Sequence, residues 1–259
     1  MNFRPLITSR CVGPLAVLLA WELASRTSLL DPVYFPPPST VLAVFSNATF
    51  VWALALNASK TIGRSLVGFV VSSTLAVCVG IALAKIEWCR RFLEPIVELL
   101  RPLPSAAVIP VCILLLGIGD VMKVAVIMFG VFWPVVVSTY QGIRNVDPVL
   151  RDAATLCGLS PLQIVTKVDL PYALPSVSAG LRISLAISLI LGVTAEMIAG
   201  SEGLGFLLLD YERGFLFREM YACILVLAII GYYLNSLYKW CESRLLFYER
   251  EDIHDRQLS

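Results

Sequence analysis

The residues best suited to chemistry in this chain lie in one polar segment, residues 147–171, between long apolar stretches. Asp147-Pro148 is typical of a helix start, with a side-chain acceptor ahead of a proline at the first helical position. Gly158 is typical of the left-handed residue that ends a helix, and Ser160 with Gln163 matches a capping box that starts another. The segment is therefore predicted to form two short helices joined at a glycine, a stiff polar protrusion suited to docking a partner outside a membrane.

The sequence contains none of the patterns that would supply enzymatic or energy-coupling chemistry. It has no Gly-x-x-x-x-Gly-Lys-Ser/Thr phosphate loop, no serine nucleophile elbow and no His-Glu-x-x-His zinc motif. The single histidine, His254, lies in the polar tail, and the seven cysteines include no Cys-x-x-Cys pair. We therefore expect no catalytic residue, metal site or bound cofactor in this chain, and we do not expect it to be an enzyme by itself.

Composition requires a membrane around most of the chain. Apolar residues make up 58% of the 259 residues, charged residues only 15%, and the mean hydropathy is +0.81. Soluble domains of this size are not built with such a composition. This composition makes the lipid bilayer the expected surrounding. The net charge of +1 gives no sign of a basic face that could bind phosphates, so nucleic acid is not an expected partner.

The pattern of apolar runs predicts an all-α integral membrane protein with six transmembrane helices, because a span needs about 20 mostly apolar residues. The predicted spans lie near residues 11–24, 63–84, 96–118, 121–142, 178–199 and 221–238. The first is short and contains a proline and a glutamate, so a secretory signal is an open alternative. Residues 1–259 are interpreted as a single membrane domain with a cytoplasmic loop over 143–177.

Lysine and arginine placement predicts the orientation of the spans. With six spans, fourteen of the 20 basic residues fall on the side of the amino terminus. Because basic residues concentrate in cytoplasmic loops, both termini and the polar segment are expected in the cytoplasm. A partner that docks on the segment would therefore also be cytoplasmic.

The polar segment resembles the coupling loop of permease subunits of ATP-binding-cassette (ABC) importers. That loop has Glu-Ala-Ala, a glycine four positions after the second alanine, and Ile-x-Leu-Pro beginning ten positions after the glycine. Asp152-Ala153-Ala154, Gly158 and residues 168–171 (Val-Asp-Leu-Pro) fall at these spacings, with aspartate in place of glutamate and valine in place of isoleucine. The match predicts that this loop couples the chain to an ATPase.

The resemblance extends over nearly the whole chain and narrows to the nitrate, sulfonate, taurine and bicarbonate permeases. The motifs that carry it lie at residues 35–42, 101–104, 117–120, 142–148, 195–197 and 203–205. It implies a type I importer fold in the bacterial cytoplasmic membrane. It also implies a second permease, either another copy of this chain or a paralogue, two cytoplasmic ATPase subunits that bind ATP and Mg²⁺, and an external solute-binding protein.

Two groups of site residues follow from these interpretations. Coupling to the ATPase is assigned to the loop residues Asp152, Ala153, Ala154, Gly158, Leu159, Leu170 and Pro171. A gate or pathway role is assigned to Glu196, Ser184, Ser188 and Lys123. Glu196 lies deep in a predicted span and is expected to pair with a cation such as Lys123 or Arg64. A purely structural charge at Glu196 and simple helix packing at the serines are open alternatives.

Two other functions are alternatives to an importer subunit. An energy-independent channel or secondary carrier should have ionisable groups at midspan. Most charged residues here lie at the ends of the predicted spans, and Glu22 and Glu196 are the notable exceptions. A membrane enzyme should have a clustered acid, base or metal site, and none can be assembled from the sequence.

The predicted orientation can be tested with thiol labelling. Cys157 lies in the cytoplasmic loop and Cys89 in the short loop after the second predicted span. In single-cysteine variants, an impermeant thiol reagent is expected to label either residue in inside-out vesicles and neither in intact cells. Labelling from outside would contradict the six-span orientation.

Overall fold

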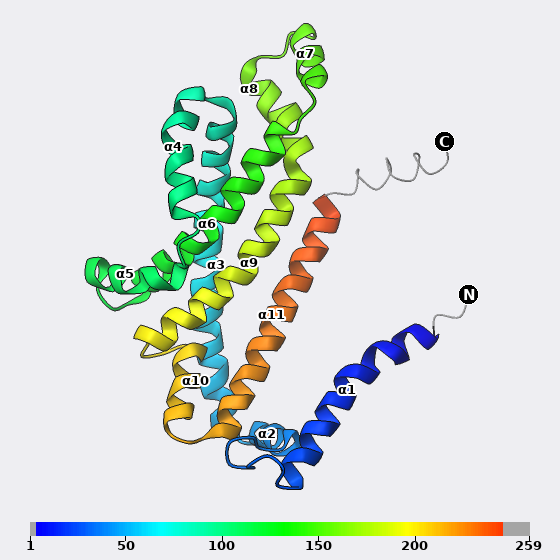
Figure 1. Cartoon of the computed structure of the whole chain (residues 1–259), viewed down its shortest axis with the longest axis vertical. Coiled ribbons are helices and arrows are strands. Elements are labelled where there is room, and N and C mark those ends of the chain that lie inside the picture. Colours follow the sequence, from blue (N-terminus) through cyan, green and yellow to red (C-terminus); the bar gives the residue numbers. More distant parts are fainter. Residues whose placement is uncertain (1–3, 246–259) are drawn as a thin grey trace.

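The computed structural model describes residues 4–245, with side chains described for residues 12–244. This part of the chain is helical, with short turns between elements (Figure 1). In order, the elements are α1 (Arg4–Arg26), α2 (Pro38–Ala43), η1 (Val44–Ser46), α3 (Ala48–Lys85), α4 (Glu87–Leu100), η2 (Ser105–Val108), α5 (Ile109–Leu116), α6 (Asp120–Arg144), α7 (Pro148–Leu156), α8 (Pro161–Ile164), η3 (Val165–Asp169), α9 (Leu170–Ala199), α10 (Leu204–Arg213) and α11 (Phe217–Leu245).

Within residues 4–245, four helices are long and apolar enough to cross a membrane: α3, α6, α11 and the continuous helix Pro161–Ala199. A fifth span results if α4 and Ser105–Leu116, which are bent by 96°, count as one. The five correspond to the predicted spans from 63–84 onward. The remaining predicted span, 11–24, lies within α1, which is not among the candidates found in the described part of the chain. Six spans therefore stay a prediction.

The core of the molecule is a three-helix bundle of α3, α6 and α9 (Figure 1). Small residues let these helices approach closely. A Cβ added at Gly80 would lie 2.6 Å from the Cβ of Thr139, and one added at Gly180 would lie 2.5 Å from Oγ of Ser138. Gly80 in α3 and Gly180 in α9 thus serve the packing of these helices against α6.

The amino-terminal end of α3 differs from the prediction. The helix starts at Ala48, well before residue 63, because the Asn47 side chain accepts hydrogen bonds from the backbone N–H groups of Thr49 (3.0 Å) and Phe50 (3.3 Å). The Ser39-Thr40 sequence after the prolines by itself predicts a short helix capped by Ser39 and running to about Phe50. Ser39 Oγ donates to the Glu22 carboxylate at 2.7 Å, so this hydroxyl joins α2 to α1 and caps no helix.

Candidate functional site

The docking segment, residues 147–171, has the local structure predicted from its capping residues. The Asp147 carboxylate accepts from the Val149 N–H at 2.9 Å at the start of α7. Gly158 follows α7 with φ +79°, a conformation that side-chain-bearing residues rarely adopt. Ser160 and Gln163 form the reciprocal capping box of α8. Beyond it the helix continues through the π-helical η3 into α9 without a break, so the protrusion is anchored directly to a core helix.

The assigned coupling residues form much of the exposed surface of this segment. Asp152, Ala153, Gly158 and Pro171 are exposed, and Ala154, Leu159 and Leu170 are partly buried. Exposed apolar side chains, which the sequence reasoning did not select, lie beside them: Leu156 is 89% exposed and Leu162 74% exposed. Each of them adds exposed apolar surface to an otherwise polar segment.

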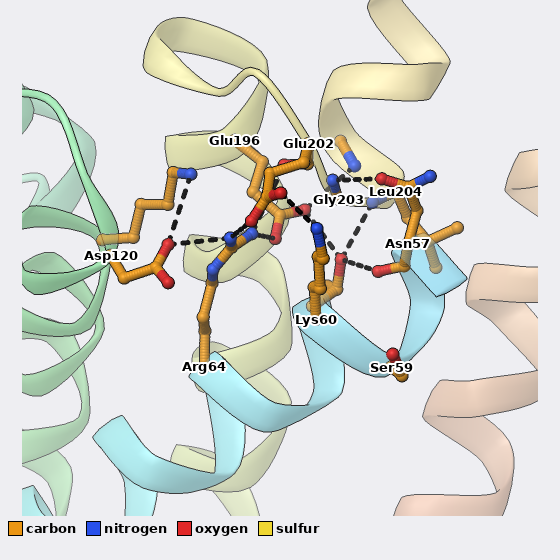
Figure 2. Close-up of polar contacts among 12 residues, drawn as sticks. Asn57, Ser59, Lys60, Arg64, Asp120, Glu196, Glu202, Gly203 and Leu204 are labelled. Atoms are coloured by element: carbon orange, nitrogen blue, oxygen red, sulfur yellow. Dashed lines mark hydrogen bonds and ion pairs between the residues drawn. The ribbon is translucent and has the colours of Figure 1, made fainter. Parts of the chain in front are cut away.

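The second candidate site is a buried ion-pair network around Glu196, near the end of α9 (Figure 2). The Glu196 side chain is fully buried, and its Oε1 pairs with Nη1 of Arg64 at 2.9 Å. Its Oε2 accepts from Oγ1 of Thr61 at 2.8 Å and from the N–H of Gly205 at 3.1 Å. A buried carboxylate with a cation and two neutral donors has its charge compensated from α3 on one side and from the start of α10 on the other.

The turn between α9 and α10 is shaped to fit this carboxylate. Gly203 has φ +108°, and a Cβ there would lie 2.2 Å from the carboxyl carbon of Glu196. The Gly203 N–H donates to Oδ1 of Asn57 at 2.6 Å, and the Leu204 N–H donates to Oγ1 of Thr61 at 2.9 Å. Polar side chains one turn apart on α3 therefore hold the turn in place, and glycine leaves room for the carboxylate.

Arg64 extends the network to α6 and to the turn. Its Nη2 pairs with Oδ1 of Asp120 at 2.7 Å and with the Glu202 carboxylate, which also pairs with Lys60 (Figure 2). The hydrogen bond from Lys60 lowers the pKa of Glu202 below its ordinary value, and Arg64 lowers it further against an opposing effect of desolvation. Arg64 thus joins α3, α6, α9 and the turn before α10 through one guanidinium.

The structure places two of the predicted gate residues in one network and the two serines outside it. Glu196 pairs directly with Arg64, one of the two expected cations, whereas Nζ of Lys123 lies 3.8 Å from the Asp120 oxygen that Arg64 also contacts. Ser184 Oγ donates to the carbonyl of Val131 at 3.0 Å, and Ser188 Oγ donates within its own helix at 2.8 Å. The Ser184 hydroxyl thus joins α9 to α6, as expected of a residue in helix packing, and the buried Ser188 hydroxyl bonds within α9.

Asn57, Thr61 and Glu202 belong to the network but were not selected from the sequence. The available signal was the run of polar residues at 57, 60, 61 and 64, which lies on one helical face within an otherwise apolar stretch. Among residues 4–245, no group of three or more His, Cys, Asp or Glu side chains is placed to hold a metal ion.

A cavity of about 260 Å³ lies beside the break between α4 and η2. Its polar lining includes Glu94, Glu98, Arg101, Tyr140 and Gln141. The interrupted helix at residues 101–104 therefore borders a cavity, which is where irregular backbone is tolerated in membrane proteins.

Comparison with known proteins gives consistent matches over most of the chain. The family described as "Binding-protein-dependent transport system inner membrane component" matches residues 76–247. The chain is 34% identical to the taurine transport system permease protein TauC of Escherichia coli (strain K12), over 90% of this chain and 87% of that protein. It is 29% identical to the putative aliphatic sulfonates transport permease protein SsuC of Bacillus subtilis (strain 168), over 90% and 84%.

Solved structures share the fold at lower sequence identity. A chain of the MetNI methionine ABC transporter in an inward-facing conformation superposes with a TM-score of 0.67 at 20% identity, covering 77% of this chain and 99% of that chain. A chain of an amino acid ABC transporter solved with histidines gives 0.62 at 15% identity, covering 80% and 97%. The helical bundle is therefore the fold found in ABC importer transmembrane components.

The fit of Gly203 against Glu196 predicts a stability effect. Gly203→Ala is expected to lower the apparent melting temperature of the detergent-solubilised protein by about 5 °C or more, because it combines a strained backbone with a clash against a buried carboxylate. Gly63→Ala is the matched control, since a Cβ at Gly63 meets nothing within 4 Å. Equal melting temperatures for the two variants would contradict the close fit.

Proposed function

The chain belongs to the family of binding-protein-dependent transport system inner membrane components, as an ABC importer permease of the sulfonate and taurine group, and from this premise we propose that it conducts taurine or a related small sulfonate. It is a transport permease and not an enzyme. The observation that carries the choice of solute is the 34% identity to the taurine permease over 90% of this chain. Nitrate and bicarbonate, which the wider resemblance includes, are the alternative solutes.

We propose that the working complex contains two copies of this permease, two cytoplasmic ATPase subunits and an external binding protein. ATP and Mg²⁺ would bind to the ATPase subunits, because this sequence lacks a phosphate loop. Six spans with both termini in the cytoplasm belong to the same proposal. The terminal residues 1–3 and 246–259 lie outside the described part of the chain.

We propose that α7 is the coupling helix and sits against the ATPase subunit. Ala153 has a short exposed side chain that lets another surface approach, and Asp152 supplies an exposed charge beside it. Leu156, at 89% exposure, would lose contact with water on docking, which favours association. The Gly158 turn and the two helix caps give this surface a defined shape before the partner arrives.

We propose that the Glu196 network holds a gate at the end of the bundle opposite the docking segment. Figure 1 shows α7 and α8 at one end of α3, α6 and α9, with α10 and the turn before it at the other. Arg64 crosslinks α3 to α6 and α9 there, so that separating these helices would break several ion pairs at once. A static structural role for the same network is the alternative.

The transport function and the coupling role are tested together in cells that lack their own sulfonate uptake. Co-expression with a cognate ATPase and binding protein is expected to give taurine uptake, and Gly158→Val or Asp152→Lys is expected to reduce it by about tenfold or more. Valine opposes the φ of +79° at the turn, and lysine reverses a charge on the docking surface. Radiolabelled taurine uptake measures both effects.

Gly158→Asn is the matched control for this experiment, because asparagine tolerates the left-handed conformation and a Cβ at this position meets nothing within 4 Å. Uptake by this variant is expected to stay near the wild-type rate. Normal uptake by both Gly158→Val and Asp152→Lys would remove the coupling role, and no taurine or sulfonate uptake by the wild type would remove the proposed solute.

The gate role predicts a change in resting ATPase activity. Glu196→Gln keeps an acceptor for Thr61 but removes the charge that pairs with Arg64, so the helices should separate more often. Basal ATP hydrolysis by the reconstituted complex is expected to rise by about threefold or more, with weaker dependence on the binding protein. Asp210→Asn, at an exposed position on α10, is the control. Unchanged hydrolysis and unchanged uptake would leave Glu196 with a structural role only.

A further inference from the structure

A second ion-pair network lies at the other end of α9, where the docking segment meets the bundle. Of the acidic residues whose side chains the structure describes, Asp169 and Glu196 are the two classed as buried, and both have 0% exposure. Asp169 is the last residue of the π-helical η3, directly before α9. A carboxylate placed out of water needs charge compensation, so its partners are informative.

The partners of Asp169 come from two other parts of the fold. Oδ1 pairs with Nε of Arg151 on α7 at 2.7 Å, and Oδ2 pairs with Lys85, the last residue of α3. Arg151 also donates from Nη2 to the backbone carbonyl of Ile143, near the end of α6. One buried carboxylate therefore connects the docking helix to all three core helices: directly to α9, through Lys85 to α3, and through Arg151 to α6.

The two networks link the same three helices at opposite ends of the bundle, one around an arginine and the other around an aspartate. At one end Arg64 of α3 pairs with Glu196 of α9 and Asp120 of α6. At the other end Lys85 of α3 pairs with Asp169, and the Arg151 guanidinium reaches α6. Ion pairs at both ends, with small residues packed between them, oppose sliding or bending of α3, α6 and α9 relative to one another.

We propose that Asp169 is a positioning residue that makes the docking segment and the α3, α6 and α9 bundle move as one body. A displacement of α7 imposed by the ATPase then reaches the Glu196 network by rotation of the whole bundle. This inference rests on the proposed function. Because Asp169 is fully buried, it does not contact the ATPase itself, and it acts through the geometry of α7.

The proposal separates docking from transmission, and Asp169→Asn tests this separation. The variant removes the charge that Arg151 and Lys85 share and keeps the side chain's size. The ATPase is expected to co-purify with the variant as with the wild type and to keep its basal activity. Taurine uptake and the stimulation of ATP hydrolysis by binding protein are expected to fall by about tenfold.

Arg151→Gln is expected to reduce taurine uptake as much as Asp169→Asn does. The double variant is expected to lose no more uptake than the more affected single variant, because both substitutions break the same network. The matched control is Glu87→Gln. Glu87 pairs with Arg90 and Arg91 on α4, but its side chain is 52% exposed, and such exposed pairs contribute little. Its uptake is expected to stay within about twofold of the wild type.

A second measurement uses the full-length permease alone in nanodiscs and does not depend on the proposed function. Spin labels are placed on Cys157, at the end of α7, and on Cys78 in α3, both exposed, with the other cysteines replaced. The distance distribution between the labels is expected to be narrow in the wild type and in Glu87→Gln, and broad in Asp169→Asn.

Each outcome decides the matter. Broadening together with loss of uptake and retained ATPase supports the proposal. An unchanged distance distribution, or broadening with normal uptake, overturns it. Loss of the variant from the membrane or loss of the ATPase from the complex also overturns it, in favour of a folding or docking role. If the wild type transports nothing with its ATPase, the proposed function fails. The distance measurement still tests whether Asp169 holds the docking segment and the bundle together.

Discussion

The burial of Glu196 beside Arg64 is the interaction on which much of this structure depends. A charge out of water is destabilising by several kcal/mol unless it is paired and hydrogen-bonded, and breaking such a pair by removing one partner typically costs about 3–5 kcal/mol. Arg64 and Glu196 satisfy that condition only if α3 and α9 keep one register and one separation. The ion pair therefore constrains the placement of both helices, and the turn into α10 must then provide the remaining donors.

Small residues and ion pairs serve complementary purposes in the bundle. In lipid, apolar side chains gain little by leaving their surroundings, so helix association depends on close packing and on polar contacts. Gly80 and Gly180 supply the close approach along the middle of the helices. The networks of Glu196 and Asp169 supply directional contacts at the ends, where a small change of register would separate the charged partners. Together these contacts oppose sliding of α3, α6 and α9 past one another.

The docking segment has a different construction, which suits the protein partner proposed for it. Its helix caps are satisfied internally, while Leu156 and Leu162 remain exposed to water. A surface of this kind keeps its shape without the partner and gains stability when the partner covers it. The absence of a phosphate loop from the sequence agrees with the proposal that ATP binds to a partner subunit.

The sequence by itself determined the features that depend on neighbouring residues. Asp147, Gly158, Ser160 and Gln163 act on backbone groups a few positions away, so the two helices of the docking segment could be predicted from spacing alone. The apolar runs likewise predicted the positions of four long apolar helices and of the bent pair of α4 and Ser105–Leu116 in the described part of the chain. They missed the early start of α3, where Asn47 caps the helix.

Only the tertiary structure decided which charges pair. Arg64 and Glu196 are 132 positions apart, and the sequence offered Lys123 equally well as a partner. Asp169 gave no sign of its role, because an aspartate in a polar segment is ordinarily exposed. Asp169 is buried at the point where α3 and α6 end and α9 begins. The position of that point depends on how the helices pack, and no local pattern of residues specifies the packing.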